Sequence, residues 1–394
     1  MPRLSFLPGW GTSGTGDRQT LILRRGKPPS VQPRPNLSLS GKERWGGPKK
    51  KKGETGMKAQ QRIRGVRFAS LLVLAGFFLL FTGGSEAGAQ AIQMKLGHFA
   101  ADSHPGNLAS KMFAEAVEKR TNGSLKVVIY PNNALGSPPE VLEQNILGAV
   151  DMSLPTQGQL GKYSKRFNCV MLPFMYNSYD QADRVLDGKF IPWAVPDLDN
   201  AGLVFLSNWE WGFRNLTNSK RPVNHPADVK GLKIRTPPEL PTQAAMEALG
   251  AVVATINFNE LQMALKTGVV DGQENPIAVI YSNKIYETQK YLTMTGHNYN
   301  TMVHVISKKV WDKLTPEQKV IVKEESKRAG DWMRKTVRTE EANQISQLKK
   351  LGMEVVIPDK GEFKKLMPPA YERMKAIAGE DNIAAFIKMV DEAK

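Results

Sequence analysis

Short apolar segments alternate with amphipathic ones between residues 94 and 267 of this 394-residue chain. The strand-like segments lie at 94–101, 124–131, 148–156, 202–218, 231–239 and 252–256, and the helix-like ones at 107–121, 138–148, 241–249 and 259–267. The first set carries apolar runs or apolar–polar alternation, whereas the second repeats apolar side chains every three or four residues. This alternation predicts an α/β fold with largely parallel sheets.

A much longer helical segment follows at 315–351. Its apolar residues include Ile321, Val322, Trp332 and Val337, set among many charges. At 1.5 Å per residue such a helix extends on the order of 50 Å. It is therefore expected to run across two domains.

The segment GLKIRTPPE at 231–239 is predicted to be a short half-buried strand, because Leu232 and Ile234 alternate with Lys233 and Arg235. The two prolines that follow end it, since proline cannot donate to a sheet ladder. Arg235 is thus expected at the carboxyl end of a strand, which is where open α/β sheets bind ligands.

The N-terminal residues divide into two parts. Residues 1–56 are rich in Gly, Pro, Ser and Lys without apolar periodicity, which predicts a disordered extension and suggests a translation start at Met57 instead of Met1. Residues 57–91 have the pattern of a signal peptide: a basic start, an apolar run at 68–81, and small residues that allow cleavage after Ala89 or Ala91. A membrane anchor is the alternative, but the apolar run is shorter than the roughly 20 residues that a spanning helix needs.

The net charge of +16 is concentrated at the N-terminus: residues 1–90 contribute +12, which leaves +4 for 91–394. A nucleic-acid-binding surface is therefore not predicted. The single cysteine, Cys169, lies in an apolar run and is expected to be a small buried side chain.

Motifs of enzymes and metal sites are missing from the sequence. The five histidines form no metal-ligand spacing, and there is no GxSxG, no Walker motif and no GxGxxG that opens a helix after a strand. We therefore expect no metal, no cofactor and no enzymatic activity. Asp271 and Glu274 could be a carboxylate pair for acid–base chemistry, but Asp271-Gly is more typical of a turn.

Several polar residues remain at predicted strand ends: Arg235, Arg214, Asn275, Gln157 and His98. Arginine offers a planar fork that matches a carboxylate and stays charged near neutral pH. Two arginines and a few amides, without a base or nucleophile, favour the binding of an anion. From the residues alone, a solvent-facing charge is an equally good interpretation of Arg235.

The chain resembles the solute-binding proteins of tripartite ATP-independent periplasmic (TRAP) transporters, the DctP family. The resemblance covers essentially all of 92–394 and is carried by GLKIRTPP, by NFNELQMALKTGVVDGQENP at 257–276, by LPF at 172–174 and by GFRNLTNSKRPV at 212–223. It implies a two-lobed periplasmic binding protein (type II-like) with hinge strands and a long helix spanning both lobes. We expect lobe I at 92–211 plus 301–340, and lobe II at 212–300 plus 341–394.

The resemblance also implies roles for individual residues. Arg235, in the K-I-R motif, is expected to pair with a ligand carboxylate, and Arg214, Asn275 and Phe258 match further ligand contacts. In the segment before LPF the polar contact falls on Thr156 or Gln157, and the motif leaves both open. His98 and Trp211 complete the predicted ligand-binding set.

The implied partners are a small carboxylate and the membrane subunits of a TRAP permease, and the protein is expected to be a periplasmic monomer. Trp209 and Trp211 offer indole donors and flat faces, which favours a sugar acid over a simple dicarboxylate. Affinity is expected to be flat from about pH 6 to 9, unless His98 adds a step near pH 6.5. The alternatives are a binding protein of an ATP-driven importer and, with no catalytic motif to support it, an exported hydrolase.

Overall fold

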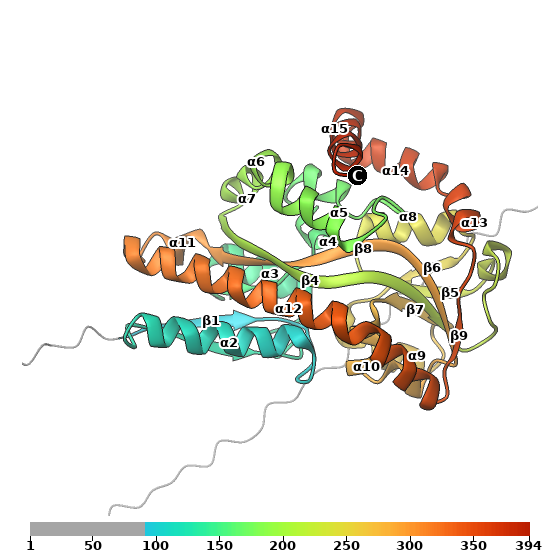
Figure 1. Cartoon of the computed structure of the whole chain (residues 1–394), viewed down its shortest axis with the longest axis horizontal. Helices are drawn as coiled ribbons and strands as arrows, with labels where there is room; N and C mark the ends of the chain where they lie inside the picture. The colour runs from blue at the N-terminus through green and yellow to red at the C-terminus, as the bar shows by residue number, and fades with distance from the viewer. Residues whose placement is uncertain (1–90) are drawn as a thin grey trace, which may run out of the picture. The chain divides into compact units, whose positions relative to one another are not determined.

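The computed structural model describes residues 91–394, shown as the coloured ribbon in Figure 1. The predictions for the extension at 1–56 and for nearly all of the signal peptide at 57–91 fall outside these residues. The described residues all belong to one compact unit. No helix in 91–394 is long and apolar enough to cross a membrane.

The strands of this part of the chain form a single mixed sheet. In chain order they are β1 (Ile92–Gly97), β2 (Leu125–Tyr130), β3 (Met152–Ser153), β4 (Leu203–Asn218), β5 (Lys233–Thr236), β6 (Val252–Thr255), β7 (Gly272–Asn275), β8 (Tyr291–Ser307) and β9 (Glu354–Val356). Their order across the sheet is β2-β1-β3-β8-β4-β7-β5-β6, and β9 pairs with β8. The six strands expected from the sequence are all present.

The prediction of largely parallel sheets holds only in part: five of the eight strand pairings are parallel, but the middle of the sheet is antiparallel. The two longest strands, β4 with 16 residues and β8 with 17, run antiparallel to each other through the middle of the sheet. Parallel pairing is confined to β1 with β2 and β3, to β5 with β6 and β7, and to β8 with β9. The sequence pattern concealed this because β4 and β8 are buried along nearly their whole length and so lack regular alternation.

The register of the sheet determines where a ligand site can form. Strand β3 pairs with β8 at Met152↔Ile306, beside the start of β4, whereas β7 pairs with β4 near its end, at Asn215↔Asn275. The β1–β3 group runs in the same direction as β4, and the β5–β7 group runs in the opposite direction. The carboxyl ends of both groups therefore point toward the middle of β4 from opposite sides.

Helices cover this sheet. They are α2 (Pro105–Arg120), α3 (Pro138–Leu147), α4 (Gln157–Leu160), α5 (Tyr179–Arg184), α6 (Phe190–Ala194), α7 (Pro196–Asn200), α8 (Leu240–Ala248), α9 (Leu261–Lys266), α10 (Ile277–Ser282), α11 (Lys308–Trp311), α12 (Pro316–Lys350), α13 (Lys360–Lys365), α14 (Pro368–Ala378) and α15 (Glu380–Asp391). The four helices predicted between residues 107 and 267 correspond to α2, α3, α8 and α9. No helix was predicted from the sequence at α4–α7, at α10 and α11, or at α13–α15.

The long helix is confirmed as α12, 35 residues from Pro316 to Lys350. It begins at a capping box in which Thr315 accepts a hydrogen bond from Gln318 N and the Gln318 side chain accepts one from Thr315 N. It packs against α2, β4 and α10, and in Figure 1 it runs from beside β1 to beside α9. It therefore contacts elements of both halves of the sheet.

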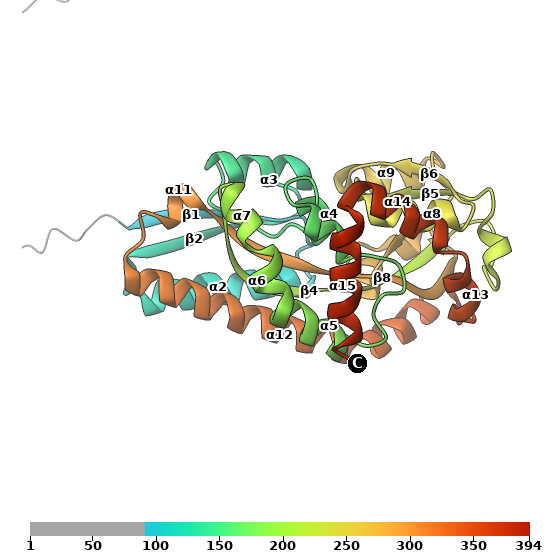
Figure 2. The same cartoon turned by 90° about the horizontal axis from the view of Figure 1, so that it is seen from above.

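The C-terminal helices α14 and α15 pack on the 157–200 segment, and α14 also packs on α8 (Figure 2). Phe386 of α15 lies 6.0 Å from Phe190 of α6, centroid to centroid, and stacks on Trp193. These helices thus contact residues that the sequence assigned to lobe I as well as residues assigned to lobe II. The proposed lobe boundaries stay a prediction.

Candidate functional site

A narrow cavity lies where the two groups of strand ends meet; we call it the Arg235 cavity. The cavity has a volume of about 20 Å³, which is room for little more than one water molecule. Its lining comes from both sides of β4 and comprises Phe99, Pro138, Pro139, Thr156, Gln159, Trp211, Arg214, Arg235, Pro237, Pro238, Glu239, Asn257, Phe258 and Asn275. An organic acid fits only if these elements move apart.

Arg235 lies one residue before the end of β5 and is only 1 % exposed. Its Nε donates to the carbonyl oxygen of Ile256 at 2.8 Å, whereas Nη2 is buried without a hydrogen-bond partner in residues 91–394. Burial lowers the pKa of Arg235 to about 10, so the guanidinium remains charged at neutral pH. A buried charge with a free donor is able to bind an anion.

Arg214 lies on β4 and is neutralised by Glu274 of β7. Its Nε and Nη2 both donate to the Glu274 carboxylate, and Nη2 also donates to the Glu274 carbonyl oxygen at 2.8 Å. His297 Nε2 lies 3.3 Å from the same carboxylate. Burial alone acts to raise the pKa of Glu274, but Arg214 and His297 hold it below its ordinary value. Of the two carboxylates considered for acid–base chemistry, Glu274 is thus an ion-pair partner, and Asp271 lies in a bend before β7.

Asn275, the last residue of β7, is held by its neighbours. Its Oδ1 accepts from Arg214 Nη2 at 3.2 Å, and its Nδ2 donates to Gln273 Oε1 at 2.5 Å. The amide is therefore fixed next to the guanidinium of Arg214 on the cavity wall.

An aromatic wall lines one part of the cavity. Phe99 makes edge contacts with Trp211 at 4.9 Å and with Phe258 at 5.4 Å, measured between ring centroids. The Arg235 guanidinium carbon lies 5.9 Å from the Phe258 centroid. Phe99 was not predicted, although its position directly after β1 and His98 is the same kind of strand exit.

Thr156 and Gln157, which the sequence left as alternatives, take different positions. Thr156 lines the cavity, and its Oγ1 donates to Glu239 Oε1 at 2.5 Å. Gln157 is not part of the lining, since its side-chain amide pairs with the backbone N–H and the hydroxyl of Thr301. Gln159, two residues further on, lines the cavity instead and was missed.

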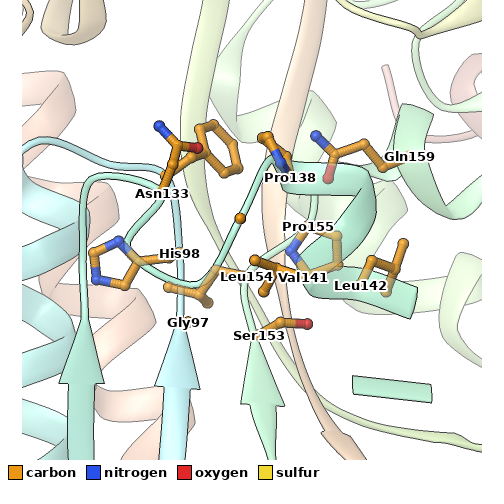
Figure 3. A pocket seen from close by; sticks show the side chains of 12 residues that line it. Gly97, His98, Asn133, Pro138, Val141, Leu142, Ser153, Leu154, Pro155 and Gln159 are labelled. Atoms are coloured by element: carbon orange, nitrogen blue, oxygen red, sulfur yellow. The ribbon is translucent and has the colours of Figure 1, made fainter. Parts of the chain in front are cut away.

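His98 lies beside a second cavity, the His98 cavity, which Gly97, Asn133, Ser153 and Gln159 also line. Figure 3 shows His98 and Gln159 on opposite sides of it. It holds about 10 Å³ and shares Phe99, Pro138 and Gln159 with the Arg235 cavity. Burial lowers the pKa of His98 to about 4. The predicted step in ligand affinity near pH 6.5 is therefore not expected, because this imidazole is already neutral at that pH.

Trp209 does not contribute to the cavity. Its indole Nε1 donates to Ser207 Oγ at 3.1 Å and to the Ser326 carbonyl oxygen at 3.0 Å, inside the core beneath α12. The idea that Trp209 offers a donor to a ligand is therefore wrong, whereas Trp211 does line the cavity. Regular alternation would place Trp209 and Trp211 on the same face of β4, but a bulge between Glu210 and Gly212 interrupts it.

Within residues 91–394, no group of three or more His, Cys, Asp or Glu side chains is placed to hold a metal ion. Burial raises the pKa of the Cys169 thiol to about 12, as for an inert core cysteine. The groups at the Arg235 cavity are cations, amides, carboxylates and aromatic rings, which suit contacts with a polar organic molecule.

The family model of bacterial extracellular solute-binding proteins, family 7 (DctP), matches residues 96–377. The chain belongs to the DctP family of TRAP solute-binding proteins. It is 33% identical over 295 residues to the 2,3-diketo-L-gulonate-binding periplasmic protein YiaO of Escherichia coli, covering 75% of this chain and 88% of that one. It is 30% identical to the C4-dicarboxylate-binding periplasmic protein DctP of Rhodobacter capsulatus, covering 75% and 90% of the two chains.

A solved structure supports the same assignment. The TRAP periplasmic solute-binding protein of Polaromonas sp. JS666, bound to D-erythronate, is 36% identical with a TM-score of 0.72, covering 75% of this chain and 98% of that one. The predicted two-lobed α/β fold with a long helix is thereby confirmed for this DctP-family protein. A solute-binding protein is not an enzyme, which also confirms that prediction.

Proposed function

We propose that this DctP-family protein binds an organic acid, and in particular a sugar acid, by an ion pair between the ligand carboxylate and Arg235. The observation that carries the proposal is the contrast between the two arginines of the cavity. Arg214 already has its counter-charge in Glu274, whereas Arg235 keeps an unpartnered Nη2 in the described part of the chain. A carboxylate arriving in the cavity therefore finds its partner in Arg235.

The energy of such a contact is large enough to matter. A hydrogen bond to a charged group contributes about 1.5–3 kcal/mol, and the guanidinium can form two in parallel. A micromolar complex requires about 8 kcal/mol in total. Asn275, Thr156 and the rings of Phe258 and Trp211 are the neighbours that would supply the rest.

Family membership supports a proposal for the location and the partners. The two curated relatives described above are named as periplasmic, and the pattern at 57–91 is that of an exported protein. We infer that the mature chain works as a periplasmic monomer and delivers its ligand to the membrane subunits of a TRAP permease.

The test is Arg235→Lys, followed by calorimetric titration with D-erythronate and other sugar acids. An ammonium group cannot reproduce the two parallel bonds of the guanidinium fork, so affinity is expected to fall at least tenfold. Lys233→Arg, an exposed exchange on the same strand, is the matched control and should leave affinity unchanged. Unchanged affinity in the Arg235 variant would remove this residue from the site.

A further inference from the structure

Glu239 introduces a negative charge into the wall of the Arg235 cavity. It is 1 % exposed; its Oε1 accepts from Thr156, and its Oε2 is buried without a hydrogen-bond partner in residues 91–394. A Cβ on Gly158 would lie 2.7 Å from that second oxygen. Glycine at this position thus leaves room for the carboxylate against α4.

The charges around the cavity already balance before any ligand binds. Arg214 and Arg235 contribute two positive charges, and Glu274 and Glu239 contribute two negative ones. One ligand carboxylate adds a single excess negative charge, which Arg235 contacts directly. A second carboxylate adds another in a buried place where water screens little, and it finds no uncompensated cation among the lining residues.

A hydroxyl group of the ligand, unlike a second carboxylate, can form a favourable hydrogen bond with Glu239. A carboxylate only accepts hydrogen bonds, and bonds from O–H donors to a charged acceptor are short and strong. The side chain of Glu239 has one oxygen occupied by Thr156 and one free. It therefore favours a ligand that brings a hydroxyl group to this wall and disfavours one that brings a carboxylate.

We propose that Glu239 is a specificity-determining residue that selects hydroxylated monocarboxylates, of the aldonate class, against diacids with the same carbon skeleton. This inference rests on the proposed function of Arg235 as the carboxylate contact. Relatives in the family are named for both a sugar acid and C4-dicarboxylates, so family membership does not decide between these classes.

The experiment uses pairs of ligands that differ at a single carbon. D-Erythronate and meso-tartrate, and likewise galactonate and galactarate, share a skeleton but end in a hydroxymethyl group or a second carboxylate. We expect the mature protein to bind the aldonate of the better-bound pair at least tenfold more tightly than the diacid. Glu239→Gln preserves the shape and an oxygen that accepts from Thr156, and it should reduce this ratio to threefold or less by strengthening diacid binding.

Two controls separate this inference from the proposed function. Glu260→Gln removes an exposed charge whose field also reaches Arg235, and it should leave the ratio unchanged because water screens it. Arg235→Lys should weaken aldonate and diacid alike. If the wild type binds no carboxylate, the proposed function fails; if it binds them through Arg235 but Glu239→Gln leaves the ratio as it was, only the role of Glu239 fails.

A third ligand class completes the test. 4-Aminobutyrate carries an ammonium group where the diacid carries a carboxylate, and tighter binding of it than of D-erythronate would overturn the hydroxyl assignment. Should Glu239→Gln fail to fold, the wild type alone provides a second measurement. Burial raises the pKa of Glu239, against the opposing charges of Arg214 and Arg235 and the bond from Thr156. The aldonate-to-diacid ratio should then narrow as pH falls toward that pKa, and a ratio independent of pH would contradict the proposal.

Discussion

At the scale of single residues, the site consists of buried charges that depend on one another. The Glu274 carboxylate accepts two bonds from the Arg214 side chain and the Glu274 carbonyl oxygen accepts a third, while Asn275, the next residue on β7, accepts a fourth. Both Arg214 and Glu274 are at most 2 % exposed. Removing either charge leaves the other buried without compensation, which costs far more than losing a surface ion pair.

We therefore expect Glu274→Gln to lower the free energy of unfolding by about 3 kcal/mol, the cost of an unpaired buried charge. Urea denaturation at pH 7 measures this change in the free energy of unfolding. The matched control is Glu324→Gln, because Glu324 pairs with Arg120 on an exposed surface; a change below about 0.5 kcal/mol is expected there. Similar losses in both variants would show that the Arg214–Glu274 pair contributes no more than a surface pair.

Much of the cavity lining could be predicted from the sequence, because these residues lie at strand ends and in recognisable motifs. Arg235, Arg214, Asn275, Phe258, Thr156 and Trp211 all lie around one cavity. Glu239 was not predicted, because its burial arises from contact with Gly158 and Thr156, which lie far earlier in the chain. Alternation and motif spacing contain no signal for such a contact.

At the scale of elements, α12 is tied to the sheet by a close approach at Gly330. A Cβ there would lie 2.6 Å from Trp209 Cδ1 and 2.9 Å from the Asn208 carbonyl oxygen. The helix also supplies Arg338, whose Nε donates to Glu210 of β4 at 2.7 Å. Backbone proximity and an ion pair thus fix the same face of α12 on β4.

Gly330→Ala tests this packing. Alanine is the better helix former by about 1 kcal/mol, but the added methyl group must displace Trp209 or the β4 backbone, and overpacking of this kind costs about 1–3 kcal/mol. We expect a net loss of up to about 2 kcal/mol in unfolding free energy, measured by urea denaturation. Lys335→Ala, exposed on the same helix, should change stability by less than about 0.5 kcal/mol. A stabilised Gly330 variant would mean that α12 does not lie this close to β4.

Strand β8 was not predicted from the sequence, and the reason is physical. Strand β8 carries His297, Asn300 and Thr301 among its buried residues, so an apolar run does not mark it. Strand β4, which was predicted at 202–218, also continues through charged residues, Glu210 and Arg214, whose charges are paired inside the protein. Local hydropathy identifies strands that bury apolar side chains, but partners that satisfy buried polar groups are distant in sequence.

Across residues 91–394 as a whole, the buried histidines, which are neutral at pH 7, form a second group of buried titratable side chains. Burial lowers the pKa of His98 to about 4 and those of His104 and His304 to about 3, and it also lowers the pKa of His297. In an unfolded chain each imidazole has a pKa of about 6.5. Their contribution to stability is therefore fully present above that value and is lost as pH falls toward 4.

Two buried carboxyl groups act in the opposite direction. Burial raises the pKa of Glu210 to about 7 and also raises that of Glu239. Below neutral pH the folded protein takes up protons on these groups before the unfolded chain does, which stabilises the fold. His225, whose pKa is raised by its hydrogen bond to Glu362, acts in the same direction as these carboxyl groups. Four histidines against these three groups leave a net uptake of protons on unfolding, so the protein should lose stability on mild acidification.

We expect the free energy of unfolding to fall between pH 7 and pH 5 by at least about 2 kcal/mol, as urea denaturation at constant ionic strength would measure. His304→Asn removes one buried imidazole while keeping an amide near Ser326 Oγ, which now lies 2.8 Å from His304 Nδ1. Whatever the free energy of unfolding of this variant at pH 7, acidification should lower it less than it does in the wild type. The difference is expected to be about 1.4 kcal/mol for each pH unit below the unfolded-state pKa. The control is His225→Asn: this exposed imidazole has its pKa raised by its hydrogen bond to Glu362, so its contribution is lost as pH rises, not as it falls. A His304 variant as acid-sensitive as the wild type would locate the acid response in other groups.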